Sequence, residues 1–149
     1  MKIAVACDHG GLNLKKEIIK YLNSKGYEVV NFGTDSYDSC DYPDYALAAA
    51  EAVASGRCER GIVVCTTGIG VCIVANKVPG VRCAYCTDTF CAQLTRLHNN
   101  ANMLALGEKV VAADCALEIV DMFLKTEFEG GRHARRVDKI TAIEKKYSK

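Results

Sequence analysis

The chain has 149 residues and is 50% hydrophobic, which suits one well-buried core and is too short for two comfortable domains. Lys and Arg total 19 against 18 for Asp and Glu, and this balance argues against a general nucleic-acid or anionic-membrane surface. No apolar run approaches the ~20 residues of a membrane span, and the N-terminus lacks a signal-peptide pattern. We therefore expect one cytoplasmic domain over residues 1–149, without nucleic-acid or membrane partners.

Short apolar runs alternate with segments of helical periodicity along the chain. The run from Gly61 to Cys65 is unbroken, which is typical of a strand covered on both faces in a parallel sheet. Leu14, Ile18 and Leu22 recur with the spacing of one helix face. In chain order we expect a strand over 2–7, the helix of Leu14 to Leu22 ending at 25–27, a strand over 28–33, a helix over 45–55, a strand over 61–65, a short helix over 69–77, a strand over 81–86, a helix over 88–100, a strand over 103–107, a helix carrying Ala116 to Leu124, and a charged C-terminal helix.

Single residues mark where some of these helices begin or end. Pro43 is favoured in a first helical turn, and Gly56 is a typical stop signal. Either Thr87 or Asp88 can cap the helix that follows.

Five alternations of strand and helix predict an α/β fold, a three-layer α/β/α Rossmann-like sandwich with a five-stranded parallel sheet and right-handed crossovers. Ligands of such sheets gather at the carboxyl ends of the strands. The loops to consider are therefore "CDHGG", "CTTGIG" and "CTDTF", which follow the first, third and fourth strands.

The glycine turn after the third strand can hold an anion. Gly68 and Gly70 allow a tight turn with outward amides at a helix N-terminus, where negative charge is favoured. An ordinary strand-to-helix turn fits the same residues. A dinucleotide fingerprint fails because Ile73 occupies its third glycine position, and no Gly-Lys-Ser/Thr follows as a nucleotide-triphosphate loop requires.

Nine cysteines is a high count, and most lie within apolar segments. In a chain without an export signal they indicate reduced, buried side chains rather than a disulfide framework. Cys65 ends a strand directly before the glycine turn, a position where a thiol can act as a base or nucleophile. An inert buried thiol is the alternative interpretation. Cys7 ends the first strand in a similar place, next to Asp8.

Two polar pairs lie near predicted element ends. Asp8 and His9, at the mouth of the first strand, offer an acid and a base, or else a helix cap with a solvated neighbour. His98 and Asn99 end a helix, where a histidine can also simply complement the helix dipole.

Arginines open the charged C-terminal segment "GGRHARR". Arg132 and Arg136 are four residues apart, so on a helix both share one face and can clamp a phosphate. A solvated basic face is the commoner meaning of such a pattern.

The spacing of Cys83, Cys86 and Cys91 raises the possibility of a metal or redox site. On a strand, however, Cys83 and Cys86 fall on opposite faces, and three thiols do not complete a four-ligand site. We expect no metal.

Several segments occur together in a familiar order: "CDHGG", "DYPDYA", "CTTGIG", "ANKVPGVR", "QLTRLHNNANMLALG" and "EGGRHARRV". As a set they resemble the type B ribose-5-phosphate isomerases, of the sugar-phosphate isomerase family that also includes galactose-6-phosphate isomerase subunits. The resemblance covers residues 2–144. It implies interconversion of ribose 5-phosphate and ribulose 5-phosphate through a cis-enediolate in the non-oxidative pentose phosphate pathway, without a metal or organic cofactor.

The resemblance also implies roles for individual residues. Cys65 is the base that moves a proton between C1 and C2, with Thr67 beside it, and His98 is the acid that helps to open the sugar ring. The backbone amides from Thr66 to Gly70 stabilise the enediolate oxygen. The implied substrate-binding residues are Asp8, His9, Thr66, Gly68, Ile69, Gly70, Asn99, Arg132 and Arg136, of which the two arginines take the phosphate.

The implied assembly is a homodimer whose active sites lie between subunits, with the C-terminal helix reaching the partner; a tetramer is also compatible. Within the family, a galactose-6-phosphate isomerase subunit is the alternative, and side activity on six-carbon aldoses such as allose is compatible too. Outside it, the alternatives are a cysteine-rich metal or redox module and a non-catalytic sugar-phosphate sensor.

Two positions depart from the family pattern. Many relatives have Gly where this chain has Thr66, whose side chain is expected to reshape the pocket beside the base. Some members lack the cysteine and use a glutamate just after the glycine turn, where this chain has Val71. Because valine cannot act as a base, the proton transfer falls to Cys65.

Overall fold

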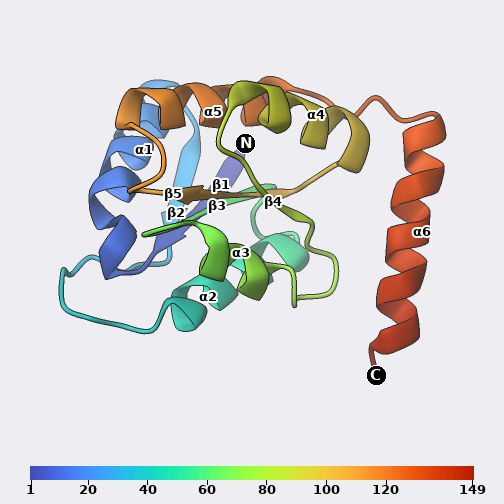
Figure 1. Cartoon of the computed structure of the whole chain (residues 1–149), viewed down its shortest axis with the longest axis horizontal. Helices are drawn as coiled ribbons and strands as arrows, with labels where there is room; N and C mark the ends of the chain where they lie inside the picture. The colour runs from blue at the N-terminus through green and yellow to red at the C-terminus, as the bar shows by residue number, and fades with distance from the viewer.

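The computed structural model describes residues 1–149 and confirms the predicted α/β fold, with a five-stranded, all-parallel sheet in the order β2-β1-β3-β5-β4 (Figure 1). The elements in chain order are β1 (Lys2–Cys7), a short 3-10 turn (His9–Gly11), α1 (Leu12–Ser24), β2 (Glu28–Asn31), α2 (Tyr42–Ala54), β3 (Arg60–Cys65), α3 (Ile69–Ala75), β4 (Cys83–Tyr85), α4 (Thr89–Asn99), β5 (Met103–Gly107), α5 (Ala113–Lys125) and α6 (Arg132–Tyr147).

Helices cover both faces of the sheet, α1, α4 and α5 on one and α2 and α3 on the other (Figure 1). Alternate residues of each strand enter different layers: Ile3 and Val5 pack toward α1 and α5, and Ala4 and Ala6 toward α2. The second layer is rich in alanine, including fully buried Ala49, so α2 packs closely on the sheet.

Several element boundaries differ from the sequence expectation. Helix α2 begins at Tyr42, three residues before the expected start, and Pro43 lies in its first turn as predicted. A proline there sacrifices no helical hydrogen bond, because the first amides of a helix have no intrahelical partner. Strand β4 has only three residues, since it pairs with β5 alone at the edge of the sheet.

Helix α6 projects beside the sandwich rather than lying on it (Figure 1). Only His133 and Val137 of this helix are buried, whereas its apolar residues Ile140, Ile143 and Tyr147 are exposed. A groove of about 1040 Å³ separates α6 from the β4 edge. No helix is both long enough and apolar enough to cross a bilayer.

Candidate active site

Cys65 is the last residue of β3 and lies at the carboxyl edge of the sheet, the edge where the strands end. Its side chain is buried, and its Sγ accepts a hydrogen bond from the backbone N–H of Gly68 at 3.1 Å. Gly68 has a φ of +84° as the N-cap of α3, and a Cβ there would come within 2.7 Å of the Leu106 carbonyl carbon. Glycine is thus required where the chain turns to point an N–H at the sulfur.

Asp8 and His9 occupy the neighbouring loop, and the structure gives each a definite role. The Asp8 carboxylate accepts the Gly10 N–H at 2.9 Å and caps the short turn, as its helix-cap interpretation predicts. His9 Nδ1 accepts the N–H of Cys40 at 3.2 Å. A neutral His9 therefore carries its proton on Nε2, which is left to donate to a ligand.

The two loops are in direct contact. Because β1 and β3 are paired, with Cys7 opposite Val64, the residues that follow them lie side by side at the point where the strand order reverses. The Thr66 hydroxyl packs against Gly10 so closely that a Cβ on Gly10 would overlap it. Thr66 thus fills the space between the loops, and residue 10 has room only for glycine.

Cys7 and Cys65 end adjacent strands but differ chemically. Cys7 is almost completely buried, and this burial, with the charge of Asp8 adding to it and that of Lys15 opposing it, raises the pKa of its thiol to about 12. Its Sγ donates to the carbonyl of Thr34. Cys7 therefore remains a protonated structural thiol at neutral pH, and of these two strand-end cysteines only Cys65 has its sulfur beside the glycine turn.

The loop after β5 supports the same site, and sequence reasoning missed it. Glu108 N–H donates to the Cys65 carbonyl at 3.0 Å, and Lys109 N–H donates to the Thr66 carbonyl at 3.1 Å. The Glu108 carboxylate also accepts the Leu14 N–H at 2.7 Å, near the start of α1. The available signal was the position of "GEK" directly after the fifth strand, at the edge where ligands gather.

His98 and Asn99 lie at the opposite edge. Helix α4 runs antiparallel to the strands and ends where β5 is about to begin, so its last residues lie near the amino edge. Asn102, three residues beyond Asn99, accepts the N–H of Gly61 at the start of β3. From Gly61 to Cys65 the strand rises about 13 Å. One chain therefore does not bring His98 and Cys65 together.

Two arginines that sequence reasoning also missed fix the end of α4. Arg82 donates to the carbonyls of Asn99 and Asn100, each at 2.9 Å, and Arg96 donates to the Ala101 carbonyl at 2.6 Å. Arg82 thus satisfies carbonyls that the C-terminus of α4 leaves unpaired, and Arg96 holds the residue that follows the cap. In the sequence, the Asn99-Asn100 pair was the available signal for this helix end, because asparagine readily adopts the left-handed conformation that Asn100 has as the cap.

His98 is stacked on His133, with ring centroids 4.1 Å apart and planes within 12°. Glu129 Oε2 lies 3.9 Å from Nε2 of each ring. Burial, assisted by the neighbouring His98, lowers the pKa of His133. These three side chains have the composition of a zinc site, but a metal lies in the plane of each imidazole that binds it, and nearly parallel rings share no such point.

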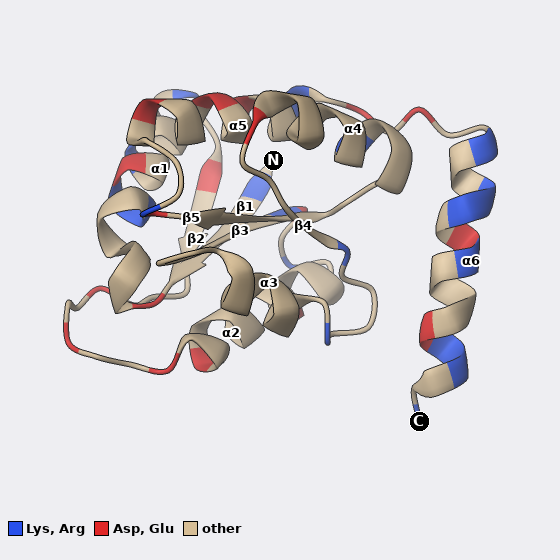
Figure 2. Cartoon of the chain, viewed as in Figure 1, with Lys and Arg blue, Asp and Glu red and all other residues tan.

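Arg132 and Arg136 are exposed in the first two turns of α6, on the shared face that their spacing predicts. Figure 2 shows that much of the ribbon in the N-terminal half of this helix belongs to basic residues. Arg132 is adjacent in sequence to His133, which stacks on His98, so the start of α6 lies beside the end of α4.

Residues 3–140 match a protein-family model described as Ribose/Galactose Isomerase. The chain belongs to the ribose/galactose isomerase family. Ribose-5-phosphate isomerase B of Escherichia coli K12 is 48% identical over 145 residues, which cover 97% of each chain.

Solved structures of this family agree in fold over nearly the whole chain. The ribose-5-phosphate isomerase B structure from Clostridium thermocellum is 61% identical with a TM-score of 0.98, and the match covers 99% of this chain and 100% of that one. The enzyme from Mycoplasma genitalium, crystallised with bound ribulose-5-phosphate, is 46% identical with a TM-score of 0.93, covering 97% and 96% of the two chains.

Because the chain belongs to the ribose/galactose isomerase family, we reject its interpretation as a cysteine-rich metal or redox module. The packing agrees, because Cys83 contacts the layer of α2 and α3 while Cys86 is buried in the layer of α1, α4 and α5. The prediction that these two residues point to opposite faces is confirmed. Together with the exposed Cys91, they do not converge on one ion.

Proposed function

We propose that this chain is a ribose-5-phosphate isomerase of type B, an aldose-ketose isomerase that interconverts ribose 5-phosphate and ribulose 5-phosphate in the non-oxidative pentose phosphate pathway. One observation carries the proposal: the sulfur of Cys65, at the sheet's reversal point, receives the Gly68 N–H beside the Asp8 and His9 loop. The substrate named for the E. coli relative and the ribulose-5-phosphate bound to the M. genitalium enzyme support it.

Proton transfer is assigned to Cys65, which removes the proton from one of the two carbons C1 and C2 and returns it to the other. The intermediate is a cis-enediolate, whose oxygen is held by the amides of residues 66–70, with Thr67 beside the base. In the free chain the Gly68 N–H donates to the Cys65 sulfur and the Ile69 N–H to the Thr67 hydroxyl, so the remaining amides of this turn are the donors available to the developing charge. A general base and a stabilised enediolate suffice for this chemistry without a cofactor.

Ring opening and substrate binding use the remaining residues. His98 is the proposed acid for ring opening, while Asp8, His9 and Asn99 bind the sugar. Ile69 and Gly70 contribute backbone contacts at the start of α3. Arg132 and Arg136 bind the phosphate, a group for which a pair of guanidinium side chains is well suited.

The proposed active enzyme is a homodimer in which Cys65 of one chain meets His98 and the arginines of the other. The separation of these residues to opposite sheet edges within one chain supports this arrangement. So do the exposed apolar side chains Ile140, Ile143 and Tyr147 on the projecting helix, which face water in an isolated chain. A second copy of the chain is the occupant that these surfaces fit.

Thr66 is the proposed determinant of substrate range. Its side chain fills the space between the two loops, and a glycine at this position would leave that space open. We expect the five-carbon phosphate to be the main substrate and six-carbon aldose phosphates such as allose 6-phosphate to be weaker ones, improved by Thr66→Gly. Equal kcat/KM ratios for the two sugars in the variant and the wild type would contradict this role.

The test of the function is Cys65→Ala, assayed with ribose 5-phosphate. We expect isomerisation to fall to the background rate, because the variant lacks the base. The circular dichroism spectrum should be unchanged, because the fold is retained. Cys58→Ala is the matched control, since Cys58 is buried in the same apolar layer but lies in the turn before β3, at the other end of that strand from Cys65. Near-normal turnover by the Cys65 variant would refute the assignment.

The galactose-6-phosphate isomerase subunit remains the second candidate, favoured by the family description itself. Such a subunit would act in a hetero-oligomer, so the purified chain alone distinguishes the two. Activity of the single chain on ribose 5-phosphate, with none on galactose 6-phosphate, is the expected result; the reverse preference would support the alternative.

A further inference from the structure

Cys72 and Cys83 form a second cysteine site, apart from Cys65. Cys72 lies in α3 and Cys83 in β4, and both are partly buried against the same apolar layer. The Cys72 thiol donates to the Cys83 carbonyl oxygen, with 3.6 Å between sulfur and oxygen. Two residues eleven positions apart in the chain are thus in contact, with the Cys72 sulfur against the backbone of Cys83 and both side chains packed on one apolar layer.

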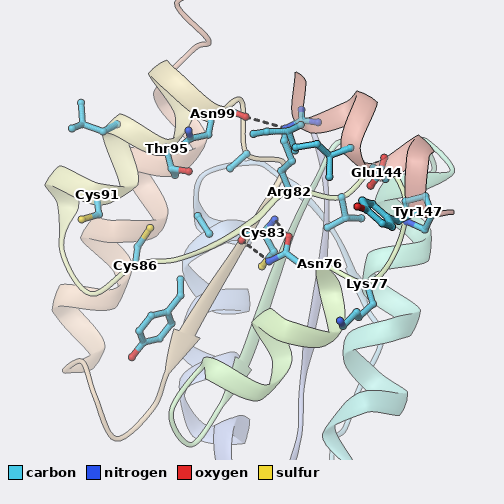
Figure 3. A pocket seen from close by; sticks show the side chains of 18 of the residues that line it. Asn76, Lys77, Arg82, Cys83, Cys86, Cys91, Thr95, Asn99, Glu144 and Tyr147 are labelled. Atoms are coloured by element: carbon cyan, nitrogen blue, oxygen red, sulfur yellow. Dashed lines mark hydrogen bonds between the residues drawn. The ribbon is translucent and has the colours of Figure 1, made fainter. Parts of the chain in front are cut away.

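Asn76 fixes this contact from both sides. Its side-chain amide donates to the Cys83 carbonyl at 2.9 Å, and its Oδ1 accepts the Cys83 N–H at 2.8 Å (Figure 3). The same amide nitrogen lies 3.6 Å from the Cys72 sulfur as a donor. One residue therefore holds β4 against the end of α3 and places a hydrogen-bond donor on Cys72.

We propose that Cys72 and Cys83 are a redox pair, in which a hydroperoxide oxidises Cys72 and Cys83 then closes an intramolecular disulfide. The proposal is independent of the isomerase activity, because neither residue belongs to the substrate site. It makes Cys72 the reacting thiol and Cys83 the resolving one.

The chemistry of the two thiols supports this order. A hydrogen bond from the Cys83 thiol, and a weaker one from Asn76, lower the pKa of Cys72 to about 7 against the opposing effect of burial. The pKa of Cys83 is raised well above its usual value, first by that hydrogen bond and then by burial. Near neutral pH the thiolate is therefore concentrated on Cys72, and the thiolate is the form that attacks peroxide.

The reaction balances with hydrogen peroxide as the oxidant. The Cys72 thiolate attacks one peroxide oxygen, the O–O bond breaks, and the departing hydroxide takes a proton to become water, leaving a sulfenic acid. The Cys83 sulfur, as its proton is lost, then attacks the Cys72 sulfur and expels the hydroxyl group as a second water. Two thiols are oxidised by two electrons in total, and one peroxide is reduced to two waters.

Peptide mapping of the peroxide-treated full-length chain tests the pair. Cleavage after Arg60, Lys77, Arg82 and Arg96 places Cys72 and Cys83 on separate peptides, and fragmentation identifies the bonded sulfurs. We expect a Cys72–Cys83 disulfide that a reductant reverses. Cys83→Ser should abolish it and leave a Cys72 sulfenic acid that dimedone traps, whereas the matched control Cys86→Ser should retain the bond.

Oxidation of Cys91 or Cys115 with Cys72 left as a thiol would overturn the proposal, as would a Cys72 disulfide that persists in Cys83→Ser. Alkylation by iodoacetamide at pH 7 gives a second measurement that needs no variant. We expect Cys72 to react faster than the exposed Cys91, whose pKa is raised by its hydrogen bond to Asp88. Reaction of Cys91 first would show that exposure alone sets reactivity.

Discussion

Cys65 and Cys7 end neighbouring strands, and their surroundings separate a proposed base from a structural thiol. Around Cys7, burial raises the thiol pKa to about 12. Around Cys65, a glycine turn supplies an N–H directed at the sulfur. Residue type and strand-end position are the same for both, so the difference comes from the loop that follows each strand.

Arg132→Ala and Arg136→Ala should each raise KM about tenfold or more and change kcat less, because a lost charge-assisted hydrogen bond costs about 1.5–3 kcal/mol. Steady-state kinetics with ribose 5-phosphate measure both parameters. Lys145→Ala, which removes the same charge from the far end of α6, is the control and should leave KM unchanged. An unaltered KM in both arginine variants would count against the phosphate clamp.

Gly10→Ala should destabilise the fold by about 1–3 kcal/mol, because the added Cβ overlaps the Thr66 hydroxyl. Most of this cost should disappear when Thr66→Gly is already present. Urea unfolding of the wild type, both single variants and the double variant gives the coupling free energy, which we expect to exceed about 1 kcal/mol. Additive effects would mean that the two side chains do not compete for one space.

A fully buried lysine joins α1 to the loop after β2. Lys15 of α1 donates to Asn31 at 2.9 Å and Asp35 at 2.8 Å, and makes a short contact with the Thr34 carbonyl. The loop held in this way continues to Cys40, whose N–H fixes the His9 ring. The lysine is thus linked to the candidate site through the loop that it anchors.

The Asp35 ion pair should make stability depend on acid pH. Hydrogen bonds from Lys15 and Asn31 lower the pKa of Asp35, so the folded state keeps this charge to lower pH than the unfolded state. The stabilisation is present above about pH 4 and is lost as pH falls through the folded-state pKa.

Melting temperatures of the wild type and Asp35→Asn at about pH 7, 5 and 3 check this expectation. The corresponding difference in unfolding free energy between the two proteins should be below about 1 kcal/mol, since the Asp35 side chain is 72% exposed. This difference should shrink toward pH 3. Asp38→Asn, in the same loop, is the control. A difference that grows in acid would contradict the assigned sign.

Apolar runs and helical periodicity located the strands and α-helices, and the spacing of Leu14, Ile18 and Leu22 reports burial directly, but the 3-10 turn at His9–Gly11 was not predicted. The first and last residues of the elements were harder to predict. Helix α2 starts at Tyr42, between Asp41 and Pro43, two residue types that suit a helix start, whereas the alanine-rich composition indicates only the middle of the helix. At the site, topology identified the loops of Asp8 and Cys65. The support from Lys15 was not predictable, since a buried cation depends on partners distant in sequence.

The candidate site is divided between two edges of the molecule. The carboxyl edge provides Cys65 with Asp8 and His9, while the amino edge and the start of α6 provide His98 with Arg132. The length of the sheet separates the two sets within one chain. The proposed dimer joins them by placing two chains in opposite orientations around a twofold axis.

Mixing two inactive variants tests this division. Cys65→Ala and His98→Ala should each be inactive on ribose 5-phosphate, yet a mixed dimer has one site with both wild-type residues. Equal amounts, dissociated and reassociated, should recover about a quarter of wild-type activity, because half the dimers are mixed and half their sites are intact. Each variant treated alone is the control, and no recovery in the mixture would place both residues in one chain's site.

The projecting helix α6 also bears on how catalysis responds to dilution. If a complete site requires α6 of a second chain, the concentration of sites is proportional to the square of the concentration of free chains. Specific activity then falls once the enzyme is diluted below the dissociation constant of the dimer, while ribose 5-phosphate remains saturating. In the proposed dimer the bound sugar phosphate contacts both chains, so substrate should shift the association equilibrium toward the dimer, and activity should fall less on dilution when ribose 5-phosphate is present beforehand.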